Sequence, residues 1–186
     1  ARVLAIAPIG GPNRGGTNVS LSGRGLLPGS SCSFGGRAAP RAVWVSQFEL
    51  VCESPPRPSG ARVVELIGGA LDSSNSKVTA MFTYVQPLQC SRIEPLLGPI
   101  MGGTVVRIMG GRFPPGPQLL CRIGAGAPTA AQWLSSAHVA CVTRPGPPGL
   151  APIRVTGNGQ DYSQGGQRFM YVDAASVLAL APRHGP

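Results

Sequence analysis

The sequence predicts an all-β protein organised as consecutive β-sandwich domains. Three observations support this prediction: a composition that resists helices, a long internal repeat, and short alternating segments between turns. The 186 residues include 27 glycines and 20 prolines, and both residue types destabilise helix interiors. Hydrophobic residues make up 42% of the chain, enough for a core, and charged residues only 12%. A disordered segment is usually rich in charge, so a folded, turn-rich protein is expected.

The repeat defines the domain organisation. Residues 3–23, VLAIAPIGGPNRGGTNVSLSG, return as residues 90–110, CSRIEPLLGPIMGGTVVRIMG, at an offset of 87. In the middle of each copy the offset becomes 89 and returns to 87 at the end, with the changes in Gly/Pro/Ser-rich stretches where loops tolerate them. The last ten residues, VLALAPRHGP, repeat residues 3–12 a third time. We therefore predict a first domain at 1–86, a second at 87–173 and the start of a truncated third repeat at 174–186.

Each copy contains segments with the periodicity of short strands. Residues 17–21 alternate, which places Val19 and Leu21 on one face and Asn18 and Ser20 on the other. The turn sequences PPRPSG and GGALDSSNS separate further segments of this kind. These segments are residues 48–52, 61–67 and 78–85.

About seven strands in about 87 residues, with turn signals roughly every ten, is the profile of an immunoglobulin-like sandwich. The pairs Gly15–Gly16 and Gly102–Gly103 each precede a predicted strand. We expect these glycines to supply a turn with positive φ, a conformational rather than a chemical role.

The repeated pattern also resembles a known family. Each copy has P-x-x-GP-x-x-GGT-x-V-x-x-x-G, then a cysteine with a glycine nearby, a second cysteine, and finally F-x-Y. This pattern resembles the IPT/TIG domain, and the resemblance covers nearly the whole chain twice. It implies an immunoglobulin-like fold of E-set type, shared by plexins, related receptors and transcription factors.

Cysteine usage separates the extracellular from the intracellular setting of this family. Cys32 and Cys52 are 20 residues apart, and so are Cys121 and Cys141. Within the resemblance, this recurrence fits one disulfide per sandwich, worth roughly 3 kcal/mol. Buried thiols are the alternative, because cysteine is a common core residue. A zinc site is disfavoured, since no C-x-x-C or paired histidine accompanies the cysteines.

Cys90 and Asn18 are two further candidate positions. Cys90 has no counterpart, because Val3 and Val177 occupy the equivalent positions. Pairing with a cysteine beyond this fragment or in another chain, and a buried thiol, both stay open. Asn18-Val19-Ser20 is an N-glycosylation sequon, and the strand alternation directs Asn18 away from the core.

Two residue types recur at matching positions outside the cysteines. Trp44 and Trp133 each lie eight residues before the second cysteine of their copy, which favours packing over a ligand-stacking platform. Asp72 and Asp161 recur in Gly- and Ser-rich loops. One carboxylate per loop does not supply the oxygens that calcium requires, so we interpret each aspartate as capping its own turn.

No catalytic residue, metal site or cofactor is predicted. Neither His138 nor His184 recurs, and the sequence has no nucleophile elbow, Walker loop or complete dinucleotide-binding motif. The net charge of +9 comes from arginines and the single Lys77, scattered along the chain rather than clustered. A nucleic-acid-binding surface would gather them on one face, so nucleic acid is not an expected partner.

The expected function is therefore that of a non-catalytic structural or adhesive module, a fragment of a larger extracellular multidomain protein. As in fibrocystin-like or plexin-like arrays, it would act as a rigid spacer and protein-binding surface on a cell or ciliary surface. Expected partners are other domains of the same chain, other proteins and a glycan. No apolar run reaches the roughly 18 residues that span a bilayer, so a membrane would be reached only through an anchor outside this fragment.

Two alternatives from other classes stay open. One is an accessory carbohydrate-binding module of a secreted enzyme, with Trp44 or Trp133 stacking on a sugar. The other is the dimerisation or DNA-contacting domain of a transcription factor, for which the net charge of +9 is the only support.

Overall fold

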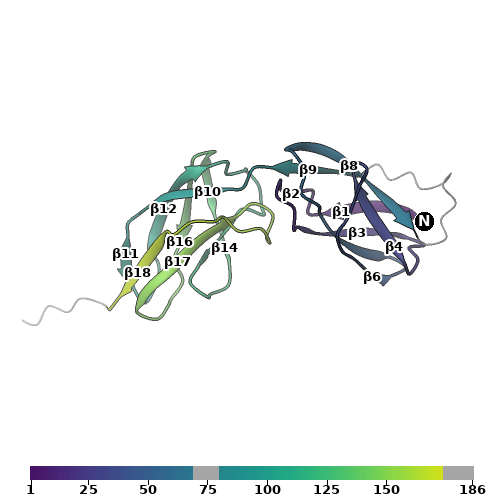
Figure 1. Ribbon diagram of the computed structural model, residues 1–186. Coiled ribbons are helices and arrows are strands. Elements are labelled where there is room, and N and C mark those ends of the chain that lie inside the picture. Colours follow the sequence, from purple (N-terminus) through teal and green to yellow (C-terminus); the bar gives the residue numbers. More distant parts are fainter. Residues whose placement is uncertain (69–79, 174–186) are drawn as a thin grey trace, which may run out of the picture. The chain divides into compact units, whose positions relative to one another are not determined.

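The computed structural model describes residues 1–68 and 80–173. These residues form strands, turns and loops without a helix, in two compact units (Figure 1). The first unit comprises Ala1–Leu88 with Thr156–Ser163, and the second comprises Gln89–Val155 with the residues from Gln164 onward. The described part of the chain thus offers no helix long and apolar enough to cross a membrane. The predicted third repeat, 174–186, lies outside the described residues.

The first unit is a sandwich of two sheets. Neighbouring strands within both sheets are antiparallel, except that β2 and β9 are parallel. The four-stranded sheet has the order β1 (Arg2–Ala7), β3 (Asn18–Arg24), β7 (Glu49–Glu53), β6 (Ala42–Ser46). The five-stranded sheet has the order β2 (Gly10–Pro12), β9 (Ala80–Val85), β8 (Gly60–Gly68), β4 (Ser30–Phe34), β5 (Arg37–Ala38).

The second unit repeats this topology strand for strand. Its four-stranded sheet has the order β10 (Gln89–Glu94), β12 (Val105–Gly111), β16 (His138–Val142), β15 (Gln132–Ser135). Its five-stranded sheet has the order β11 (Leu97–Pro99), β18 (Arg168–Val172), β17 (Gly149–Thr156), β13 (Leu120–Ile123), β14 (Thr129–Ala130). The predicted all-β fold with immunoglobulin-like sandwiches in tandem is confirmed.

The alternation used for the strand predictions corresponds to the two faces of the sheets. In β3, Val19 and Leu21 are fully buried, Asn18 is exposed and Ser20 is half-buried. The predicted segments 48–52 and 61–67 correspond to β7 and β8, and the described part of 78–85 forms β9. Each unit therefore places its inward-facing residues between two sheets, where they form the core.

Aromatic rings form the centre of the first core. Phe34, Phe82 and Tyr84 contact one another edge to face, with ring centroids 4.9–6.5 Å apart. The second unit keeps the pair Phe169 and Tyr171, 5.0 Å apart. At the position of Phe34 it has Ile123, which is only half-buried. The second core thus has a smaller and less buried side chain at this position.

The paired glycines adopt the predicted conformation. Gly15 and Gly16 have φ values of 78° and 87°, and Gly102 and Gly103 have values of 76° and 82°. The first glycine of each pair is also close to a loop backbone, since a Cβ on Gly102 would lie 2.6 Å from the carbonyl carbon of Arg144. A Cβ on Gly103 would meet no atom within 4 Å. Only the first glycine of each pair is therefore required by both conformation and space.

Candidate functional site

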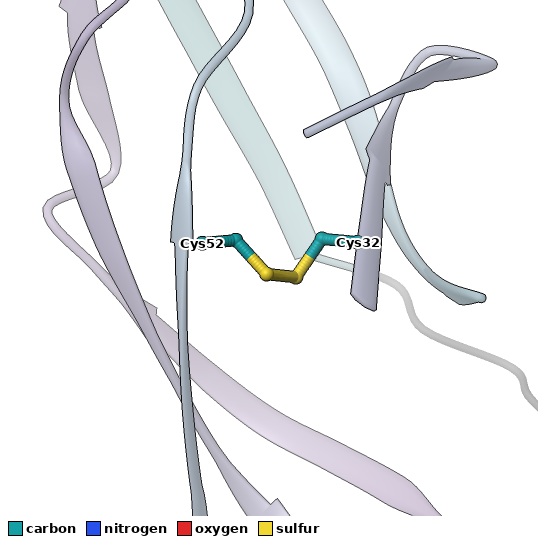
Figure 2. Close-up of a disulfide and its surroundings, with 2 residues drawn as sticks. All are labelled: Cys32 and Cys52. Atoms are coloured by element: carbon teal, nitrogen blue, oxygen red, sulfur yellow. A yellow bond between two sulfur atoms is a disulfide. The ribbon is translucent and has the colours of Figure 1, made fainter. Parts of the chain in front are cut away.

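The four cysteines with matching spacing form two disulfides, one in each unit. Cys32 on β4 is bonded to Cys52 on β7, with the Cα atoms 6.2 Å apart (Figure 2). Cys121 on β13 and Cys141 on β16 form the second disulfide, also with Cα atoms 6.2 Å apart. In each case the two strands belong to different sheets. Each disulfide therefore crosses the core and joins the two layers of its sandwich.

Cys90 lies on β10 and takes part in neither disulfide. Its exposed fraction is 8%, the same as that of Val3 at the equivalent position on β1. Cys90 thus fills the space of a small apolar core residue. Its pairing with a cysteine outside this chain stays a prediction.

The recurrent tryptophans lie on edge strands, Trp44 on β6 and Trp133 on β15. Their indole N–H groups donate to the carbonyl oxygens of Leu26 and Phe113, each at 3.0 Å. These bonds hold the Trp44 ring against the loop that follows β3 and the Trp133 ring against the loop that follows β12. The rings are nevertheless 40% and 43% exposed, so each leaves part of its surface accessible on an edge strand.

The sequon asparagine, Asn18, is exposed at the start of β3, and its glycosylation stays a prediction. The interpretation of Asp161 as the residue that caps its loop is wrong. Asn158 has that role, because its Oδ1 accepts from the backbone N–H groups of Gln160 at 3.2 Å and Asp161 at 2.9 Å. The Asp161 carboxylate instead accepts from the Asn158 side-chain amide at 2.6 Å. Asp72 lies outside the described residues.

One of the two histidines, His138, lies within the described residues. His138 is exposed on β16, with its Nδ1 3.1 Å from the Ser135 hydroxyl. Within the ranges described, no three His, Cys, Asp or Glu side chains gather in a way that could hold a metal ion. His184 lies outside these ranges.

A cavity of about 600 Å³ lies in the second unit, and sequence reasoning did not predict it. It is bordered by the end of β13 with the following β13–β14 turn (residues 123–127) and by the β16–β17 loop (residues 144–148). Arg122, Arg144 and Arg154 contribute to its lining, and so does Tyr171. The Tyr171 hydroxyl donates to the Arg144 carbonyl oxygen at 2.8 Å, and burial raises the pKa of this phenol.

Comparison with known proteins agrees with this architecture. The family model described as IPT/TIG domain matches residues 1–84 and 88–171. The chain therefore belongs to the IPT/TIG domain family, and it contains two such domains in tandem.

Plexins are among its relatives. The chain is 33% identical over 117 residues to Plexin-A2 of Mus musculus, a match that covers 58% of this chain and 6% of that protein. It is 35% identical over 100 residues to Plexin-B3 of Homo sapiens, covering 50% of this chain and 5% of that protein. The chain thus corresponds to a small part of the length of these relatives.

A solved structure shows the same fold. The full extracellular region of Plexin A4, domains 1 to 10, matches with a TM-score of 0.64 and 22% sequence identity. The match covers 97% of this chain and 16% of that chain.

Proposed function

We propose that the chain is an extracellular, non-catalytic module of a plexin-like ectodomain, which acts as a structural spacer and as a surface for protein binding. The observation that carries this proposal is the pair of disulfide-bonded IPT/TIG sandwiches in tandem. Disulfides of this kind persist in oxidising compartments, which supports a location outside the cytosol. The plexin relatives support the receptor type of array rather than the fibrocystin type. The ciliary location stays a prediction.

The spacer role is supported by the separate sheets and disulfide of each unit and by the short segment between β9 and β10. Each unit has its own two sheets and its own disulfide. Residues 86–88 alone lie between the end of β9 and the start of β10. We place the domain boundary after residue 86 and the end of the second domain at residue 173.

Protein binding is supported by the apolar edge strands. β6 exposes Val43, Trp44 and Val45, and β15 exposes Trp133 and Leu134. Both strands end their four-stranded sheet in the described structure. Exposed edge strands can pair with the strand of another chain, and their side chains then contribute specificity.

The proposal is tested on the chain secreted from eukaryotic cells, by intact mass after thiol alkylation with and without prior reduction. Four cysteines protected until reduction, at Cys32, Cys52, Cys121 and Cys141, are expected. A mass increase removed by a glycosidase, and absent from Asn18→Gln, would place a glycan on Asn18. Alkylation of all four cysteines without reduction would contradict the extracellular assignment.

The partly exposed indoles of Trp44 and Trp133 favour a second candidate function, the stacking of a glycan on the edge strands. Indole fluorescence is expected to change on titration with soluble oligosaccharides if either ring stacks on a sugar. The variants Trp44→Phe and Trp133→Phe would identify which ring responds. Unchanged fluorescence across a panel of neutral and acidic oligosaccharides would eliminate this candidate.

A further inference from the structure

The cavity of the second unit lies where the first unit has an arginine side chain. Arg57 and Gly146 are equivalent, because their backbone N–H groups donate to the matching carbonyl oxygens of Asn13 and Ile100, both at 2.9 Å. The Arg57 guanidinium crosses toward the β4–β5 turn, and its Nη2 donates to the Gly35 carbonyl oxygen at 2.8 Å. In the first unit, the Arg57 side chain therefore bridges the β7–β8 loop and the β4–β5 turn.

The second unit has no side chain to place there, because residue 146 is glycine. A Cβ on Gly146 would lie 3.0 Å from the ring of Tyr171, so the ring occupies the space beside this loop. The remaining volume, about 600 Å³, falls within the roughly 300–1,000 Å³ range of ligand pockets.

The charges around this position also differ between the units. In the first unit, Ser33 on β4 donates to Glu65 on the neighbouring strand β8 at 3.0 Å. The second unit has Arg122 and Arg154 at the corresponding positions on neighbouring strands β13 and β17. Like charges on adjacent strands are destabilising, and an anion bound between them would offset that repulsion.

A third arginine strengthens the positive charge. Arg144 stands where the first unit has Pro55, and it also lines the cavity. The lining contains no aspartate or glutamate. The cavity is thus complementary to a ligand that carries more than one negative charge.

The walls of the cavity indicate which anionic ligand fits. Four of the lining residues are prolines, which lack a backbone N–H donor: Pro145, Pro147, Pro148 and Pro152. Ile123, Val142 and Leu150 add apolar surface. Such walls offer few hydrogen bonds to sugar hydroxyls but suit an aliphatic or aromatic side chain.

We propose that this cavity binds an acidic peptide segment of a protein partner. One apolar side chain of the segment would enter the cavity, and flanking carboxylates would pair with Arg122, Arg144 and Arg154. This proposal rests on the proposed function as a protein-binding module, and it specifies the chemical character of the partner segment and where that segment binds.

The experiment uses the 186-residue chain, labelled with ¹⁵N, and three capped hexapeptides as probes. The first probe, EELLEE, has acidic and apolar residues, while QQLLQQ lacks the charge and EESSEE lacks the apolar side chains. We expect EELLEE to shift the amide signals of Gly124, Gly146 and Gly149. Both control peptides are expected to bind at least tenfold more weakly, because QQLLQQ loses the charge-assisted hydrogen bonds and EESSEE loses the buried leucine side chains.

Two variants and a matched control locate the site. The double variant Arg122→Ser/Arg154→Glu introduces the residues of the first unit, and Gly146→Arg introduces the side chain that fills the space there. Each is expected to weaken EELLEE binding at least tenfold. The control Arg92→Glu/Arg107→Ser makes the same change in net charge on the exposed face of the other sheet and is expected to leave binding unchanged.

Several outcomes would overturn the proposal. These are equal binding of EELLEE and QQLLQQ, equal weakening by the pocket and control variants, and the absence of shifts at millimolar peptide. Tighter binding of a sulfated oligosaccharide that is lost in the double variant would replace the peptide with a glycan. Each of these results would leave the disulfides and the extracellular role intact, so failure of this site is distinguishable from failure of the proposed function.

Discussion

Removal of the disulfide of the first unit should destabilise that unit by an amount that follows from the number of residues between its two cysteines. The change is the double variant Cys32→Ala/Cys52→Ala, which removes the link between β4 and β7. The two cysteines are separated by 20 residues. On the chain-entropy account, opening a loop of that length lowers the free energy of unfolding by about 3 kcal/mol. Because both side chains are fully buried, the lost sulfur contacts add on the order of 1 kcal/mol.

The second unit provides the comparison. Cys121 and Cys141 are also 20 residues apart and also join the two sheets. The loop-entropy contribution is therefore the same, and Cys121→Ala/Cys141→Ala should destabilise its own unit by a similar amount. The two variants should differ only through the packing around the sulfur atoms.

Scanning calorimetry of the whole chain measures both effects. A loss of about 3–4 kcal/mol corresponds to a decrease of roughly 12–30 °C in the midpoint of the affected unit, at about 4–8 °C per kcal/mol for a domain of this size. Shifts below about 4 °C, or a first-unit effect more than twice that of the second, would refute the loop-entropy reasoning.

Three further predictions concern single positions. Cys90→Val should change the free energy of unfolding by less than about 1 kcal/mol in urea denaturation, because Val3 has the same exposed fraction at the equivalent position. A larger decrease in stability would indicate a specific role of the thiol. Gly103→Ala should lower the free energy of unfolding by about 1 kcal/mol, because residue 103 has a positive φ. Gly102→Ala should lower it by at least about 2 kcal/mol more, because the added Cβ meets the loop backbone. Equal decreases for the two variants would contradict the close approach of Gly102 to that loop. Burial raises the pKa of Tyr84 from 10.0 to about 12, so the phenol ionises first in the unfolded state. Stability should then fall by about 2–3 kcal/mol as the pH rises from 10 to 12, and Tyr84→Phe should reduce this decrease in alkaline denaturation.

The parts of the fold that were predicted from sequence are those with a strong local signal or a signal present in both copies. The alternation of Val19 and Leu21 identified β3, and the recurrence of the paired glycines identified the turn before it. β4 carries no such signal, because four of its five residues are buried and its sequence shows no alternation. β6 lacks the signal for the opposite reason, since AVWVS is apolar but lies exposed on a sheet edge.

The Asp161 loop and the cavity of the second unit are harder to predict from the sequence than the strands. Asp161 recurs with Asp72 and was expected to cap its loop, yet the non-recurrent Asn158 accepts the loop's backbone bonds. Recurrence identifies shared architecture, whereas the cavity of the second unit is lined at positions where the two copies differ. The change from Arg57 to Gly146 is visible in the sequence, but its consequence requires the three-dimensional neighbours.

The difference between the copies leads to a last prediction, on the balance of stability and binding. The first unit stabilises this region with the Ser33–Glu65 hydrogen bond, while the second places Arg122 and Arg154 on neighbouring strands. Arg154→Glu should therefore convert a repulsive pair into an attractive one, and cross-strand charge pairs contribute about 0.2–1 kcal/mol. We expect this variant to be more stable in urea denaturation and to bind EELLEE more weakly.

The control Arg92→Glu makes the same charge change on β10, where the directly opposite residue on β12 is Met109 rather than an arginine. A gain in stability with Arg154→Glu but not with Arg92→Glu would show that the arginine pair has a local energetic cost. Proteins commonly retain such costs where a site needs them for binding. If Arg154→Glu is instead less stable than the unaltered chain, the arginines support the sandwich itself, and their arrangement no longer argues for an anionic ligand.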